Sequence, residues 1–304
     1  MVLVAPRPLS RPMSGAAPES PGGEVLALLR GDAAARPSFD PGLAGGLRAW
    51  LEDAAYRVVA SRGDLAPPLV LGPREVLGTA PPATLDGPGG ASGGVAGDGV
   101  PDEVIVARLV HALFRRLVTD EEIDDPLSDA LDALRAEGSK GARTATQVAA
   151  MDDTARSVLG AVVSTHAAHL VDLVPRLAPG WMPRTDDRVA IPLAGGRVVL
   201  HGVFDLLVGL PRAGTASLCA LGLCTGGSWA RARRALHYLA LLETLRTGTP
   251  PFRLALLETG SGRYGIEDVR EEHLCALTSH VAAWLADVEP DSRRDSSAAR
   301  VPRG

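Results

Sequence analysis

The sequence is almost without lysine. Of its 31 basic residues, 30 are arginine and only Lys140 is lysine. Any chemistry that needs an ammonium group therefore has a single candidate. Cysteine and aromatic residues are also scarce, with three cysteines in 304 residues and 4% aromatic residues. Three cysteines do not form a disulfide framework, so we expect a reducing compartment and a cytoplasmic protein.

Long hydrophobic runs are missing as well. No apolar stretch approaches the roughly 20 residues that a membrane-spanning helix needs. The N-terminus has no charged head followed by an apolar segment, which is the pattern of a secretory signal. We therefore expect no membrane partner. The net charge of −5 argues against attraction of the whole molecule to nucleic acid, although a local basic patch remains open.

The sequence does hold enough apolar material, at 46% hydrophobic residues, for one or two folded domains. Both ends and one internal segment are instead rich in proline, glycine and small or polar residues. Such compositions are typical of chain that does not bury a core. They predict disordered tails over 1–23 and 289–304, and a long low-complexity loop over 78–100.

Apolar residues recur at helical spacing through the first half of the chain. The pattern predicts helices over 43–60, 101–119, 126–137 and 144–173. The first of these belongs to a helical N-terminal region over 24–77. We expect one further domain over 101–288.

The pattern changes to strands after residue 187. Strands are predicted over 188–193 and 197–207, joined by the turn Ala194-Gly195-Gly196, and again over 217–224 and 252–258. Helices are predicted over 228–247 and 266–288. A helical half therefore precedes a half that alternates strands and helices.

Short motifs in this second half follow one another in a known order. Gly202-Val203-Phe204-Asp205 lies in a predicted strand, Thr225-Gly226 follows the next strand, and Tyr238 lies in the helix after it. Together with His111 upstream, they resemble the PD-(D/E)XK nuclease superfamily, in its RecB-like exonuclease branch. The resemblance covers residues 101–287. It implies an α/β, restriction-endonuclease-like fold, a mixed sheet flanked by helices, with an added helical N-terminal region.

The functional residues of that family carry over only in part. The resemblance implies that Asp205 is the first metal-binding carboxylate, that His111 is an upstream ligand and that Tyr238 is the tyrosine of the helix motif. The second acid of the family falls on Gly222, the catalytic lysine on Cys224 and the glutamine of the helix motif on Arg234.

Those three replacements bear directly on hydrolysis. Mg²⁺ prefers oxygen ligands, and it lowers the pKa of an attacking water. A glycine offers no side-chain oxygen, and a thiol does not replace an ammonium group. We therefore expect impaired catalysis. If the protein is active, the resemblance implies Mg²⁺ and a relocated acid, for which Glu243 and Glu258 are the candidates. An ordinary structural ion pair is the alternative role for each of them.

The candidate ligands also have structural alternatives. Asp205 interrupts an apolar run, where a charge is costly unless it is paired or liganded, so it is either a metal ligand or bonded to backbone amides or arginine. His111 lies on an apolar helix and is either a core histidine or a ligand. An iron–sulfur cluster, which some relatives hold with four cysteines, is not expected, because no cysteine precedes Cys219.

The junction before residue 229 suggests an anion site without reference to any family. Ser228 is a good N-cap candidate, and free amides and the helix dipole attract phosphate at such an end. Arg231, Arg234 and Tyr238 share one helical face. The two arginines are either solvated or in contact with a nucleic-acid backbone.

Three functions follow from these observations. The first is a nuclease-fold protein with impaired catalysis that retains DNA binding, with a role in DNA processing or repair. The second is an active Mg²⁺-dependent DNA nuclease with a relocated acid. The third is a non-catalytic interaction or scaffold protein, whose protein partners the sequence does not identify.

Overall fold

A computed structural model describes residues 21–30, 36–62, 66–78, 102–177, 179–210 and 216–287. The predicted C-terminal tail and nearly all of the predicted loop over 78–100 lie outside these ranges. The first predicted tail overlaps α1 (Pro21–Arg30), which takes up its last three residues. No helix in the described ranges has both the length and the apolar character to cross a membrane.

The centre of the fold is a mixed six-stranded sheet. Its strands are β1 (Leu69–Leu71), β2 (Arg184–Leu193), β3 (Val198–Val208), β4 (Cys219–Cys224), β5 (Arg253–Glu258) and β6 (Arg263–Asp268). β3 pairs antiparallel with β2 along nearly its whole length. It also pairs with β1, in parallel at residues 198–200, and with β4, antiparallel at residues 206–208. Because β2 occupies one edge of β3, β1 and β4 both pair with the other edge. Residues 201–205 of β3 lie between these two pairings.

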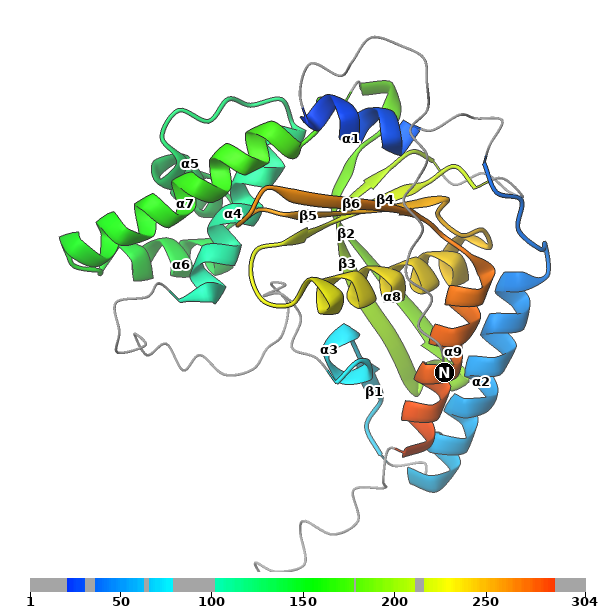
Figure 1. Cartoon of the computed structure of the whole chain (residues 1–304). Coiled ribbons are helices and arrows are strands. Elements are labelled where there is room, and N and C mark those ends of the chain that lie inside the picture. The colour runs from blue at the N-terminus through cyan, green and yellow to red at the C-terminus, as the bar shows by residue number, and fades with distance from the viewer. Residues whose placement is uncertain are drawn as a thin grey trace, which may run out of the picture.

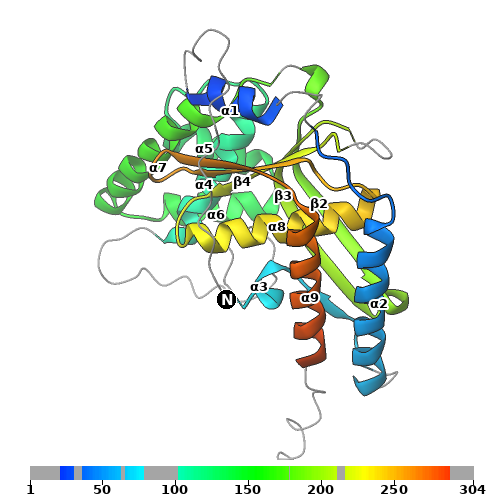
Figure 2. The ribbon, with the colours of Figure 1, turned by 45° about the vertical axis from the view of Figure 1, so that its right-hand side comes forward.

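Helices cover both faces of this sheet. The first group is α2 (Leu43–Arg62), α8 (Trp229–Thr247) and α9 (Glu271–Asp287), with the short α3 (Pro73–Val76) after β1. The second group is α1, α4 (Glu103–Val118), α5 (Pro126–Ala136), α6 (Ser139–Ala149) and α7 (Asp153–Leu173). Figures 1 and 2 show α8 along one face, α2 beside α9, and α4 to α7 gathered away from them.

Two apolar clusters correspond to the two faces, and they are called here the α8 side and the α4 side. The α8 side holds residues of α2, α8 and α9, and the α4 side holds residues of α1, α4 and α7. The predicted α/β class, a mixed sheet flanked by helices with a helical N-terminal region, is confirmed. The N-terminal region also supplies β1, a strand that the sequence did not indicate.

Two of the predicted helices, over 144–173 and 266–288, were wrong in part. The single helix over 144–173 is two helices, because Asp152 caps a new one: its side chain accepts a hydrogen bond from the amide of Ala155 at 2.7 Å. The last helix does not begin at Ile266. Residues 263–268 form β6, which returns against β5 through a turn that ends at Gly262 (φ 71°), and α9 begins only at Glu271.

An ion cluster joins α8 to β6. Glu267 accepts hydrogen bonds from Arg233 at 2.9 Å and from His237 at 2.6 Å, and the ring of His273 from α9 meets that of His237 edge-on at 5.3 Å. Burial alone would raise the pKa of the Glu267 carboxyl. The hydrogen bonds from His237 and Arg233 outweigh burial and lower this pKa to about 2.

This cluster predicts an acid-dependent loss of stability. Because the folded pKa of Glu267 lies below its ordinary value of 4.5, its ion pairs stabilise the fold above pH 4.5, and this contribution fades as the pH falls toward about 2. Urea unfolding of Glu267→Gln should therefore show a smaller drop in free energy between pH 6 and pH 3 than the parent protein. Asp53→Asn, at an exposed pair with Arg57, is the control and should keep the parent's drop. An unchanged drop in Glu267→Gln would contradict the assignment.

Candidate functional site

The carboxylate of Asp205 is held by two protein groups. Its Oδ2 accepts a hydrogen bond from the amide of Leu223 in β4 at 2.7 Å. Its Oδ1 lies 3.3 Å from Nδ1 of His111 in α4, and 12% of the Asp205 side chain is exposed. The structure therefore brings Asp205 and His111 together, as the resemblance implies. Each of the two carboxylate oxygens therefore faces a protein group.

Further charges from α4, from the residue that follows α5 and from β2 surround this pair. Arg115 lies one turn after His111 and forms ion pairs with Asp186 at 3.2 Å and with Glu137. Burial is the main influence on Asp205 and raises the pKa of its carboxyl. His111, the Leu223 amide and Arg115 oppose that rise, while Asp186 adds to it. These five side chains form a partly neutralised group of charges where α4 faces the sheet, called here the Asp205 network: Asp205, His111, Arg115, Asp186 and Glu137.

A break in the side-chain alternation of β3 separates Asp205 from the residues of β3 that pair with β4. In a regular strand, residues two apart face the same side. Phe204 packs on the α8 side, yet Leu206 packs on the α4 side and Leu207 again on the α8 side. The alternation therefore shifts between residues 204 and 206. Opposite this point in the pairing register, Asp186 of β2 has a left-handed backbone with φ 52°.

The neighbouring strand β4 keeps its alternation, so the two motif positions face the other way. A Cβ atom on Gly222 would lie 3.4 Å from Leu236 of α8 and 3.5 Å from Leu256 of β5. Cys224 packs in the same α8-side cluster, and burial raises the pKa of its thiol. The backbone of β4 thus touches Asp205 through Leu223, but the side-chain positions 222 and 224 point to the opposite face.

The two acids considered as replacements also lie with the α8 side. Glu243 is fully buried and forms an ion pair with Arg246 at 2.6 Å, and burial raises its pKa. Glu258 is aligned with Cys224 in the parallel register and pairs with Arg263 at 3.1 Å. Both occupy ordinary ion pairs, which is the structural alternative that the sequence left open.

The described side chains around Asp205 do not provide the set of oxygen ligands that Mg²⁺ needs. Within the described ranges, no group of three or more His, Cys, Asp or Glu side chains is placed to hold one metal ion. Asp205 offers one carboxylate whose two oxygens already face His111 and an amide. The residues present therefore do not fit the ion that the family resemblance implies.

Tyr238 lies in the interior rather than at Asp205. It is fully buried in the α8-side cluster, and its hydroxyl donates to the carbonyl of Leu71 at 3.1 Å. Burial raises the pKa of this hydroxyl, so it remains protonated. The contact ties α8 to β1, and the role that the structure supports for Tyr238 is packing.

The start of α8 carries positive charge at its surface. Ser228 is the N-cap residue by position, but its side chain makes no capping bond. Arg231 is half-buried and Arg234 is exposed, and no carboxylate in the described part of the chain pairs with either. Nearby, the guanidinium of Arg263 lies 4.0 Å above the ring of Trp229. The uncapped amides and the two arginines form a basic surface, called here the α8 entry.

The sequence did not single out three members of the Asp205 network. Arg115 follows His111 by four residues, and this spacing on one helical face was a usable signal. Asp186 and Glu137 come from other elements, and no motif marks them.

Comparison with protein-family models and with curated proteins finds no match for the chain.

Proposed function

We propose that this chain is a PD-(D/E)XK-type, RecB-like protein that binds DNA at the α8 entry without hydrolysing it. The observation that carries the proposal is the pair Arg231 and Arg234, which no described carboxylate pairs with and which lie beside the uncapped amides of α8. Cations in the first turns of a helix oppose the helix dipole, so an anion bound there relieves an unfavourable arrangement. Arginine forks and free amides together match the oxygens of a phosphate backbone.

The Asp205 network supports the absence of hydrolysis. Cleavage of a phosphodiester in this class needs a metal ion that binds oxygen ligands and activates a water. Asp205 faces α4, positions 222 and 224 face α8, and Glu243 and Glu258 are held by arginines. The alternative of an active enzyme with a relocated acid has no comparable support.

A binding and cleavage experiment tests the proposal. Fluorescence anisotropy with a labelled DNA duplex and a labelled single strand, at 50 and 200 mM salt, should show affinity that falls steeply with salt, because phosphate contacts release counterions. Parallel gels with Mg²⁺ or Mn²⁺ should show uncut DNA. Salt-independent association would favour the scaffold alternative, and metal-dependent cleavage would favour the active nuclease.

Removing the two arginines should weaken this binding selectively. Arg231→Ala with Arg234→Ala is expected to lower DNA affinity at low salt by about tenfold and to reduce the slope of log affinity against log salt by about 2, one for each lost phosphate contact. The matched control is Arg57→Ala with Arg135→Ala, which removes the same net charge from exposed pairs with Asp53 and Asp132.

The control should bind DNA as the parent does. Equal losses in the two double variants would mean that only net charge matters. No loss in either would show that the α8 entry does not contact DNA. Either result would contradict the placement of the interface.

A further inference from the structure

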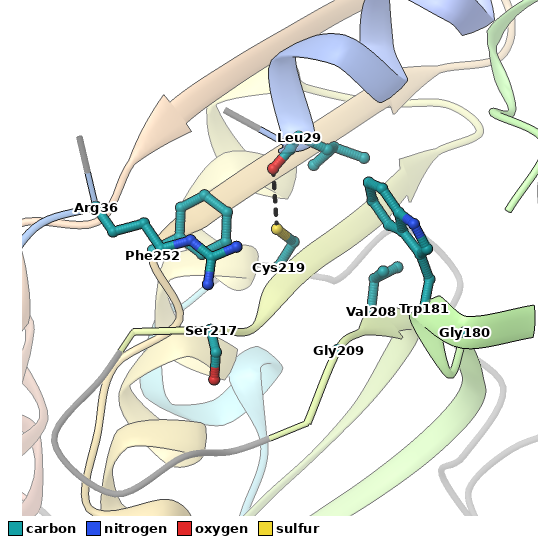
Figure 3. Close-up of a pocket in the computed structure, with 9 residues that line it drawn as sticks. All are labelled: Leu29, Arg36, Gly180, Trp181, Val208, Gly209, Ser217, Cys219 and Phe252. Atoms are coloured by element: carbon teal, nitrogen blue, oxygen red, sulfur yellow. Dashed lines mark hydrogen bonds between the residues drawn. The ribbon is translucent and has the colours of Figure 1, made fainter. Parts of the chain in front are cut away.

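A separate cavity lies on the α4 side of the sheet, where β3 ends and β4 begins. Its volume is about 260 Å³. It is lined by Leu29, Arg36, Gly180, Trp181, Val208, Gly209, Ser217, Cys219 and Phe252 (Figure 3). None of these residues belongs to the Asp205 network or to the α8 entry, so the cavity is a feature that the proposed function does not use.

Arg36 is the charged side chain among the described residues that line this cavity, and the guanidinium of Arg253 lies close by, 5.4 Å from the ring centre of Phe252. The guanidinium carbon of Arg36 lies 4.9 Å from the ring centre of Phe252, and Figure 3 shows the group held between Phe252 and Cys219. Its Nε atom is buried and has no hydrogen-bond partner among the described residues. A buried donor without an acceptor is unfavourable, so an acceptor that enters the cavity would gain a hydrogen bond from this atom.

The remaining walls are neutral, and several are flat and apolar. Among the described residues that line the cavity there is no aspartate or glutamate, and the Phe252 and Trp181 rings and Val208 supply apolar surface. Cys219 donates to the carbonyl of Leu29 at 3.3 Å, and burial raises the pKa of its thiol to about 12, so it adds no negative charge. Ser217 is turned to the carbonyl of Leu210 at 2.6 Å.

We propose that this cavity binds a small aromatic carboxylate. The carboxylate would pair with the guanidinium of Arg36, whose planar fork matches two carboxylate oxygens. The ligand ring would lie against Trp181 and the edge of the Phe252 ring, because the guanidinium groups of Arg36 and Arg253 lie over the Phe252 ring and aromatic rings also favour edge-on neighbours. The volume lies just under the 300–1,000 Å³ typical of drug-sized sites, which fits a ligand with one ring. This inference is independent of DNA binding.

Ligand-observed NMR on the full chain tests the proposal with three probes. Benzoate should bind, whereas benzamide, which has the same ring without the charge, should bind at least tenfold more weakly. Inorganic phosphate, a charge without a ring, should also bind at least tenfold more weakly. Equal binding of benzoate and benzamide would overturn the role of Arg36, and equal binding of phosphate would overturn the role of the rings.

Two variants locate the site. Arg36→Gln should lower benzoate affinity at least tenfold, and Arg36→Lys, which keeps the charge but loses the fork, should lower it less. Arg57→Gln on the outer surface of α2 is the control and should leave benzoate binding unchanged. Unchanged binding in a folded Arg36→Gln variant would overturn the proposal. If circular dichroism shows that Arg36→Gln does not fold, the Arg36→Lys variant and the three probes on the parent protein decide the question.

Discussion

Gly222→Asp is expected to lower the free energy of unfolding by about 3–5 kcal/mol. The new carboxylate would enter the α8-side core beside Leu236 and Leu256, where the described contacts of Gly222 include no cation. An unpaired buried charge is among the costliest single changes in a protein. Urea unfolding monitored by circular dichroism measures the loss.

The matched control for this change is Gly222→Ala. It adds the same Cβ atom, whose nearest neighbours lie at 3.4 and 3.5 Å, without a charge. Its cost should stay within about 1 kcal/mol, a typical effect of a change without a polar mismatch. A cost shared equally by the two variants would mean that space, and not charge, makes position 222 intolerant.

The double variant Gly222→Asp with Cys224→Lys should also fail to cleave DNA in Mg²⁺. Restoring the two family residues does not restore a metal site, because both side chains would face α8 while Asp205 faces His111 of α4. Metal-dependent cleavage by this double variant would contradict the finding that side chains at positions 222 and 224 face away from Asp205.

Arg246→Ala is expected to cost about 3–5 kcal/mol, as is usual when one partner of a buried ion pair is removed. Arg246 binds the fully buried Glu243 and also Asp187 of β2, at 3.0 Å. Without Arg246, the buried carboxylate of Glu243 loses its ion-pair partner and keeps only the weaker influence of Arg184. Because burial already raises its pKa, the deficit should shrink when the pH falls and Glu243 takes up a proton.

Two further variants of this protein serve as controls for this prediction. Adding Glu243→Gln to Arg246→Ala should recover part of the loss at pH 7, since a buried amide costs less than a buried charge. Arg57→Ala, at an exposed pair with Asp53, should change stability by no more than about 1 kcal/mol. If Arg246→Ala behaved like Arg57→Ala at every pH, Glu243 would not be the buried, arginine-dependent acid described above.

Much of the local structure follows from the sequence alone. The apolar repeats over 43–60 and 101–119 predicted α2 and α4 to within two residues at each end, and the strand predicted over 197–207 corresponds to β3. Such periodicity reports which side of an element is buried, and it needs only neighbours along the chain. The split before Asp153 and the strand β6 were missed, because a cap and a returning strand depend on single side chains and on pairing with β5.

Local motifs also indicated that Asp205 and the strand of Gly222 and Cys224 lie side by side, and the hydrogen bond from Leu223 to Asp205 places them so. Only the tertiary structure decided which way these side chains face. One left-handed residue, Asp186, lies opposite the point where β3 changes its alternation, and after that change Asp205 faces His111 while Gly222 of β4 faces α8. A motif records residue types and spacing, whereas the direction of a side chain depends on how neighbouring strands pair and bend.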